Sequence, residues 1–172
     1  MSRVRIETEL GDIELEVFER QAPASAGYFL ADVQAGRYDG SSFFRIVTLS
    51  NQSAEKHRRI AVIQGGLSHE REDLPPVIPH ETTAMTGLRH LQGTVSLARF
   101  APGAVYHSFF ICLRDEPVLD FGGARHADGQ GFAAFGRVVQ GFQVVQGIFA
   151  RAEKSEYLRN EIAIRRATAI VA

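Results

Sequence analysis

The chain lacks features that mark several protein classes. It has no tryptophan, a single cysteine and almost no net charge, because 19 Lys and Arg residues oppose 20 Asp and Glu residues. A lone Cys112 cannot form an internal disulfide, and its apolar neighbours indicate a buried thiol in a reducing compartment. The balanced charge offers no basic field that would attract nucleic acid. No apolar run approaches the roughly 18–20 residues that span a bilayer, so we expect no membrane segment.

The start of the chain and its length set further expectations. The first residues begin directly on an alternating strand pattern and contain no apolar core of a secretory signal, which predicts a cytoplasmic location. A length of 172 residues predicts one domain, residues 1–172, with a substantial core. A monomer is the expectation for such a domain without an evident apolar patch.

The hydrophobic pattern predicts a mainly β protein. Alternation on both sides of Leu10-Gly11 predicts an antiparallel hairpin over residues 3–17. Pro23 suits the first turn of a helix that ends near Gly36, and a second helix is expected over 142–149. Without βαβ alternation, we expect a closed eight-stranded antiparallel barrel capped by two α-helices. The further strands are expected at 41–47, 60–64, 94–98, 108–113, 132–139 and 162–171, and exposed loops at 48–59, 67–91 and 114–131.

Metal, hydrolytic and nucleotide chemistry find no support in the motifs. The six histidines are scattered, and the run that begins His80-Glu81 resembles a zinc-protease motif but lacks its second histidine. Ser108 beside His107 places the two side chains on opposite faces of a strand, which is wrong for a nucleophile and its base. The Gly65-Gly66 pair lacks the strand–glycine–helix setting of a phosphate loop. We therefore expect no metal and no cofactor.

The most informative stretch is Phe43-Phe44-Arg45-Ile46-Val47. Strand alternation predicts that Phe43, Arg45 and Val47 share one face. An arginine among apolar residues either covers them with its stem or holds its guanidinium ready for a ligand. Taken alone, the stretch leaves both readings open.

One chemistry requires only aromatic side chains and a placed arginine, namely rotation about a prolyl peptide bond. Its barrier of about 18–20 kcal/mol is the loss of amide resonance, and no covalent bond breaks. An apolar pocket can hold the proline ring while a donor hydrogen-bonds the prolyl nitrogen, whose lone pair becomes available only in the twisted state. That contact is stronger in the transition state than in either isomer, which is the condition for catalysis.

Short runs spread over nearly the whole chain resemble the cyclophilins, the barrel-shaped peptidyl-prolyl isomerases, and occur in that family's order. The polar insertion before Gln64 and the run over 128–132 look like a bacterial branch of the family. The resemblance implies isomerase activity on X-Pro bonds in protein substrates, assistance to protein folding, no cofactor, and proline-containing peptides and unfolded or folding proteins as partners. The runs are Phe43-Phe44-Arg45-Ile46-Val47, Gln64-Gly65-Gly66, Gly93-Thr94-Val95-Ser96-Leu97-Ala98, Ser108-Phe109-Phe110-Ile111-Cys112 and Phe135-Gly136-Arg137-Val138.

The resemblance also implies a set of site residues. Arg45 falls on the family's catalytic arginine, Gln64 on the glutamine that helps hold the substrate backbone, and Phe110 on the aromatic floor of the proline pocket. These three form the expected catalytic set. The expected substrate-binding residues are Phe43, Ala61, Val62, Ala98, Arg99, Ser108, Val118, Leu119 and Phe132.

Six of these positions depart from the family pattern, the mildest being Val62 in place of a methionine. Ala61 replaces a phenylalanine, Arg99 an asparagine, Ser108 a glutamine and Phe132 a histidine. Val118 replaces the tryptophan that is important for cyclosporin binding, so we expect weak binding of that drug. The departures leave open a second hypothesis, a module that binds proline-containing segments with little catalysis. A barrel that encloses a small apolar ligand is a third reading, which gains nothing from Arg45 or Gln64.

Overall fold

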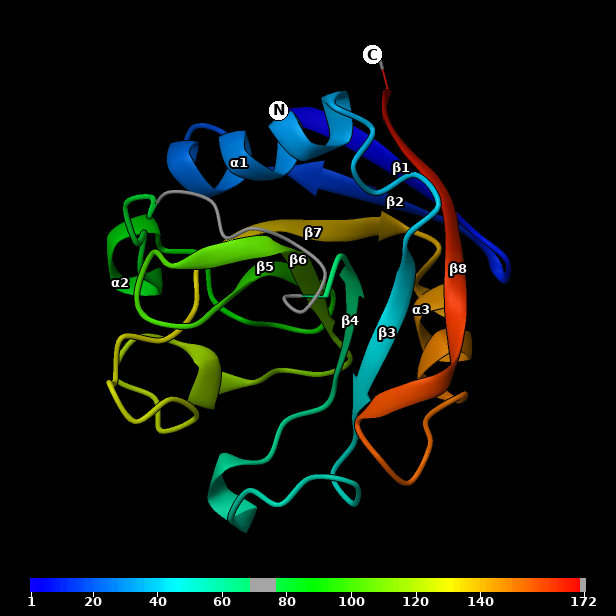
Figure 1. Ribbon diagram of the computed structural model, residues 1–172. Helices are drawn as coiled ribbons and strands as arrows, with labels where there is room; N and C mark the ends of the chain where they lie inside the picture. Colours follow the sequence, from blue (N-terminus) through cyan, green and yellow to red (C-terminus); the bar gives the residue numbers. More distant parts are fainter. Residues whose placement is uncertain (69–76, 171–172) are drawn as a thin grey trace.

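The structure is a computed structural model that describes residues 1–68 and 77–170. The described residues form a closed barrel in the order β1-β2-β7-β5-β6-β4-β3-β8, and each pair of neighbours is antiparallel (Figure 1). The expected fold class is confirmed. The strands are β1 Ser2–Thr8, β2 Gly11–Val17, β3 Ser42–Val47, β4 Val62–Gly66, β5 Thr94–Arg99, β6 Val105–Cys112, β7 Ala134–Gln140 and β8 Tyr157–Ile170.

Within the described residues, three α-helices accompany the barrel. The expected helices are α1 Pro23–Gln34 and α3 Phe142–Phe149, and both contribute to the apolar core of the barrel. A four-residue helix that was not expected, α2 Thr83–Thr86, lies in the segment predicted to be a loop, where the Thr82 side chain caps it and Gly87 ends it at φ 75°. Pro75-Pro76 of that segment and Val171 of the expected last strand lie outside the described residues. None of the described helices is long and apolar enough to cross a membrane.

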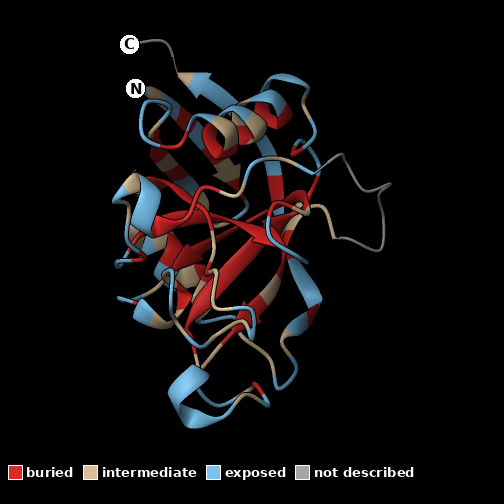
Figure 2. Cartoon of the chain, turned by 90° about the vertical axis from the view of Figure 1, so that its left-hand side faces the viewer, coloured by how far each residue is buried: buried red, intermediate tan, exposed pale blue. Residues whose placement is uncertain are grey.

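The core fills the inside of the barrel, and Figure 2 shows buried residues concentrated along its strands. Phe29 of α1 packs at 5.6 Å, edge to face, on Phe109 of β6, and Phe43 of β3 makes a similar contact at 5.8 Å. A smaller apolar cluster is separate from this core and contains Val47, Val62, Phe110, Cys112 and Leu119, with Ile60. Along β6, Phe109 therefore faces the barrel interior and Phe110 the outer cluster.

Helix α1 is held at both ends. Its N-cap residue, Ala22, provides no side-chain acceptor, and the buried carboxylate of Glu81 accepts hydrogen bonds from the backbone nitrogens of Ala24 and Ser25 instead. At the other end Gly36 adopts φ 70°, and Gly36 and Arg37 donate to the carbonyls of Val33 and Asp32. These two bonds form a Schellman motif, which satisfies carbonyls that the helix leaves open.

Strand β3 contains a bulge that changes which side chains share a face. Phe43 pairs with Gly65 and Arg45 with Gln64, so the register shifts between Phe43 and Arg45. The expected common face of Phe43, Arg45 and Val47 is therefore wrong at Phe43, which lies fully buried in the barrel core. A bulge inserts one residue and reverses the alternation beyond it. Arg45 and Val47 face outward as a result.

The glycines opposite the bulge permit this packing. A Cβ on Gly65 would lie 2.8 Å from the Phe43 ring, and one on Gly66, at φ 104°, would lie 2.6 Å from the carbonyl oxygen of His107. Side chains at either position would push β3 and β6 away from β4. The Gln64-Gly65-Gly66 run thus combines an outward-facing polar side chain with close contact on its inner side.

Candidate active site

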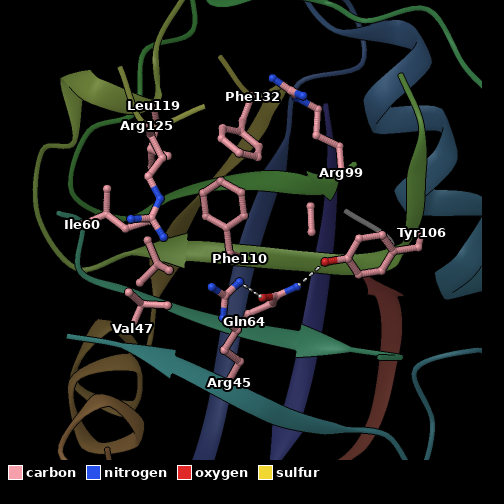
Figure 3. A pocket seen from close by; sticks show the side chains of 12 residues that line it. Arg45, Val47, Ile60, Gln64, Arg99, Tyr106, Phe110, Leu119, Arg125 and Phe132 are labelled. Carbon is pink, nitrogen blue, oxygen red and sulfur yellow. Dashed lines mark hydrogen bonds between the residues drawn. The ribbon is translucent and has the colours of Figure 1, made fainter. Parts of the chain in front are cut away.

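A cavity of about 120 Å³ opens on the outer face of β3, β4, β5 and β6 (Figure 3). Eight of the expected site residues line it, so the structure brings most of the expected set together. Four further residues complete the lining. The expected eight are Arg45, Val62, Gln64, Ala98, Arg99, Phe110, Leu119 and Phe132, and the additional four are Val47, Ile60, Tyr106 and Arg125.

Arg45 is fixed from two sides. Its Nε and Nη2 donate to Oε1 of Glu156 at 3.1 and 2.5 Å, and its Nη1 donates to Oε1 of Gln64 at 3.1 Å. The guanidinium also lies 5.3 Å from the centre of the Tyr157 ring. A guanidinium has five N–H donors, so two have no partner among the described residues, and Arg45 lines the cavity. The carboxylate thus orients the cation and leaves part of it available.

Gln64 links Arg45 to the rest of the strand. Its amide nitrogen donates to the Tyr106 hydroxyl at 3.1 Å and to the Ser108 hydroxyl at 2.9 Å, and Ser108 in turn donates to the Gly65 carbonyl. Burial raises the pKa of Tyr106, so its phenol stays neutral near pH 7. The buried amide is fully engaged within the protein, which fixes its oxygen toward Arg45.

The floor of the cavity is Phe110, supported from behind by a buried histidine. His90 lies parallel to the Phe110 ring at 6.0 Å, Phe132 meets that ring edge to face at 5.6 Å, and His90 also contacts the Ser96 hydroxyl at 2.9 Å. Nδ1 of His90 lies 2.8 Å from Oδ1 of Asp120. Burial opposes the charge on Asp120, but the hydrogen bonds from His90 outweigh it and lower the pKa of the carboxyl. Ser96, His90 and Asp120 resemble a hydrolase triad, but both Ser96 and His90 are buried, so the arrangement supports the floor.

Arg99 lies at the rim of the cavity, where its contacts within the protein hold a loop in place. Its guanidinium forms a two-pronged ion pair with Asp128 at 2.9 and 3.0 Å, donates to the carbonyls of Gly131 and Phe100, and lies 4.8 Å from the centre of the Phe132 ring. The Arg99 hydrogen bond, chiefly, lowers the pKa of Asp128 to about 2. The pair fastens the loop before β7 onto β5 and holds Phe132 over the cavity.

Four expected binding residues do not line the cavity. Phe43 lies in the barrel core because of the bulge, and Ser108 lies beneath Gln64, which it supports through a hydrogen bond. Ala61 is buried, and its backbone nitrogen donates to the buried Glu116. Val118 is half-buried and packs against the outer apolar cluster. The structure thus places these four residues around the cavity rather than on its wall, and their contact with substrate stays a prediction.

Three polar or charged residues that line or adjoin the cavity were missed at the sequence level: Glu156, Tyr106 and Arg125. Glu156 lies just before β8, 111 positions from Arg45, and nothing in its local sequence marks it. Tyr106 fits the strand pattern of β6, and its outward orientation was predictable from Phe110 four residues later. Arg125 lies in a glycine-rich loop whose course has no periodic signal. Among the described residues, no three His, Cys, Asp or Glu side chains form a group that would hold a metal ion.

A pocket with an aromatic floor and a fixed arginine, on the outer face of a closed antiparallel barrel, is the arrangement expected of the barrel-shaped peptidyl-prolyl isomerases. A solved cyclophilin type peptidyl-prolyl cis-trans isomerase of Cryptosporidium parvum has the same fold, with a TM-score of 0.79, 22% identity and coverage of 99% of this chain and 98% of that one. The chain belongs to the cyclophilin family, because the model of the cyclophilin type peptidyl-prolyl cis-trans isomerases matches residues 3–169.

Bacterial relatives agree with this assignment. The peptidyl-prolyl cis-trans isomerase cyp18 of Streptomyces antibioticus is 32% identical over 149 residues, which are 86% of this chain and 83% of that protein. Peptidyl-prolyl cis-trans isomerase B of Escherichia coli is 29% identical over 146 residues, 84% of this chain and 82% of that protein. The expected bacterial type of cyclophilin is confirmed.

Proposed function

We propose that the chain accelerates rotation about X-Pro peptide bonds at the cavity between Arg45 and Phe110, and thereby assists protein folding. The observation that supports this assignment is the way in which the Arg45 guanidinium is held. Its guanidinium is anchored by Glu156 and Gln64 and keeps donors toward an apolar cavity. A cation oriented in advance costs little reorganisation when the substrate twists.

In this mechanism the proline ring packs on Phe110, between Val62, Leu119 and Phe132. As the peptide bond turns, the prolyl nitrogen loses conjugation and becomes an acceptor, and Arg45 donates a hydrogen bond to it. The bond strengthens only in the twisted state, so it lowers the barrier. Gln64 acts by holding Arg45, since its own donors are used within the protein.

The test is cis–trans exchange of an Ala-Pro peptide followed by NMR, with wild type and Arg45→Ala compared. A charge-assisted hydrogen bond is worth about 1.5–3 kcal/mol, so the variant should lose about ten- to 200-fold in rate. A loss of exchange rate below about threefold would contradict the role given to Arg45. If wild type shifts the peptide signals without faster exchange, the protein is instead a module that binds proline segments. The departures from the family pattern at Arg99 and Phe132 motivate this alternative.

The setting of the protein is part of the same proposal. We place the protein in the bacterial cytoplasm, as a monomer that acts on unfolded or folding proteins. The free, buried Cys112 supports the location, because thiols stay reduced in that compartment. Weak cyclosporin binding agrees with Val118, which packs against the outer apolar cluster and offers the drug no indole ring. Sedimentation at the mass of one chain and exchange rates that excess cyclosporin leaves unchanged are the expected results.

A further inference from the structure

Arg125 adds a further guanidinium to the active-site cavity, which Arg45 and Arg99 also line. Figure 3 shows it on the Ile60 and Val47 side of Phe110, opposite Arg99 and Tyr106. It belongs to the loop that precedes β7 and crosses to the segment between β3 and β4. There its Nη1 donates to Oε1 of Gln52 at 2.8 Å and to the Arg58 carbonyl at 3.2 Å.

The position of Arg125 is fixed by a buried amide. Gln52 is 7% exposed, and its amide nitrogen donates to the carbonyls of Thr48 and Ile60, which closes the segment into a loop. The amide oxygen is then directed at Arg125. The guanidinium is thus held by one nitrogen in a defined place.

Arg125 forms no ion pair within the described part of the chain, and Glu156 and Glu116 attract its charge only from a longer distance. Its Nε and Nη2 have no hydrogen-bond partner in the same residues. Arg99 and Arg45, by comparison, are each paired with a carboxylate. Burial first, and then the like charge of Arg45, lowers the pKa of Arg125, which indicates an environment that an anion would improve.

A second cavity begins where Arg125 ends. It measures about 510 Å³, shares Arg45 and Arg125 with the first, and is lined otherwise by Gln52, Glu156 and four residues between 53 and 58. Arg58 adds another cation to its wall. Glu156 is occupied by Arg45, and the exposed Glu55 lies 3.5 Å from His57. Arg125 therefore lies where the two cavities adjoin.

We propose that Arg125 and the second cavity form a subsite for a carboxylate side chain next to the proline, so that the protein prefers X-Pro segments with a neighbouring Asp or Glu. The inference rests on the proposed function, because it takes the first cavity as the place of the proline ring. A guanidinium with its Nε and Nη2 edge open matches a carboxylate in geometry. The wall of the second cavity carries Arg45, Arg58 and Arg125 against Glu55 and Glu156, a net charge of one, which a single carboxylate neutralises and a dianion such as a phosphate exceeds.

The experiment uses blocked peptides in which the side chain is the only carboxylate. Ala-Ala-Pro-Glu-Ala is compared with Ala-Ala-Pro-Gln-Ala, and Ala-Glu-Pro-Ala-Ala with Ala-Gln-Pro-Ala-Ala, each titrated by NMR so that affinity and exchange are read together. In at least one pair, wild type should bind the Glu peptide about fivefold more tightly, the value of about 1 kcal/mol for a partly exposed ion pair. The preference should fall in about 0.5 M NaCl because salt screens it.

Variants decide whether Arg125 is responsible. Arg125→Gln should bring the affinity ratio close to one, and Arg125→Lys should keep part of it, since lysine retains the charge without the fork. Arg151→Gln, the same charge change at an exposed residue after α3, should keep the wild-type ratio. If Arg125→Gln does not give a folded spectrum, the lysine variant takes its place, with a reduced ratio expected.

The outcomes separate the two proposals. Equal affinity for Glu and Gln peptides in wild type, or a preference that survives Arg125→Gln, overturns the subsite even if exchange is fast. A preference that disappears in the variant supports the subsite even if no peptide exchanges faster, and the isomerase proposal then fails by itself. Absence of binding by every peptide overturns both.

Discussion

At the scale of single residues, the site depends on the bulge in β3. The sequence pattern places Phe43 and Arg45 on one face because alternation is the default of a strand. The extra residue sends Phe43 into the core and leaves Arg45 outside, where Gln64 and Glu156 fix it. The sequence was thus sufficient to predict Arg45 as a site residue. It was not sufficient to predict which strand residues share its face, because the bulge cannot be read from the pattern.

Glu156 is predicted to be a positioning residue for Arg45. Glu156→Gln removes the charge that orients the guanidinium, so exchange at saturating peptide should fall about three- to tenfold while peptide affinity stays near wild type. Both side chains are partly exposed, at 25% and 22%, so the free energy of unfolding should change by less than about 1 kcal/mol. The measurement is NMR exchange together with urea unfolding.

A matched control for this variant is Glu14→Gln, which breaks the exposed ion pair with Arg5 between β1 and β2. It should leave exchange unaltered. Activity of Glu156→Gln within twofold of wild type would contradict the role, and so would an equal loss in the control.

Cys112 is predicted to be unreactive in the folded protein. Burial, followed by the nearby negative charges of Glu116 and Asp120, raises the pKa of its thiol well above the usual range. The reactive thiolate is therefore scarce, and the sulfur lies beneath the floor residues Phe110 and Val62. Reaction with a disulfide reagent near about pH 8 should be slow in buffer and fast in denaturing urea. Rapid labelling in buffer would show that the outer apolar cluster opens readily.

At the scale of elements, Glu81 connects two segments that the sequence gives no reason to join. Its carboxylate accepts from the backbone nitrogens of Ala24 and Ser25 and from the Ser25 hydroxyl, at 2.7 to 3.1 Å. An acceptor is needed because Ala22 precedes the helix with none to offer. A negative charge at this end also interacts favourably with the helix dipole.

Removal of that acceptor should destabilise the protein. Glu81→Ala leaves buried helix donors without a partner, so the free energy of unfolding should fall by about 1–2 kcal/mol, the range for loss of an N-cap. Urea unfolding measures the loss, and hydrogen exchange should quicken at Ala24 and Ser25. Thr82→Ala, which removes only the cap of the four-residue α2, is the control and should cost less. Equal stability of wild type and Glu81→Ala would refute the remote cap.

The strands and the long helices were predictable because their signals are local. Alternation over β1 and β2, Pro23 and the Gly36 cap each act within a few residues, and the structure confirms them. Glu81, Glu156 and Arg125 act across 56, 111 and 73 positions, so their partners follow only from the closed barrel. The short α2 was missed because one turn has no periodicity to detect.

At the scale of the whole molecule, the long loop before β7 completes the site by its attachments. Asp120 contacts His90 behind the floor, Asp128 is paired with Arg99 at the rim, and Arg125 crosses to Gln52. Arg99 is almost fully buried, so loss of its partner would leave a guanidinium held only by carbonyl groups. Ionisation of the loop carboxylates therefore contributes to global stability.

This coupling predicts how stability depends on pH. The pKa of Asp128 in the folded protein is about 2, below its ordinary value of 3.8, because Arg99 stabilises the carboxylate. A lowered pKa gives stability that is fully present above the ordinary value and is lost as pH falls toward the folded value. Asp128→Asn should lower the free energy of unfolding by about 1 kcal/mol near neutral pH, a figure reduced for solvent exposure. The difference between wild type and variant should shrink between about pH 4 and pH 2, because protonation of Asp128 in wild type removes the same charge. Urea unfolding across that range measures it, and a difference that stayed constant into acid would mean that the pair holds the loop through packing alone.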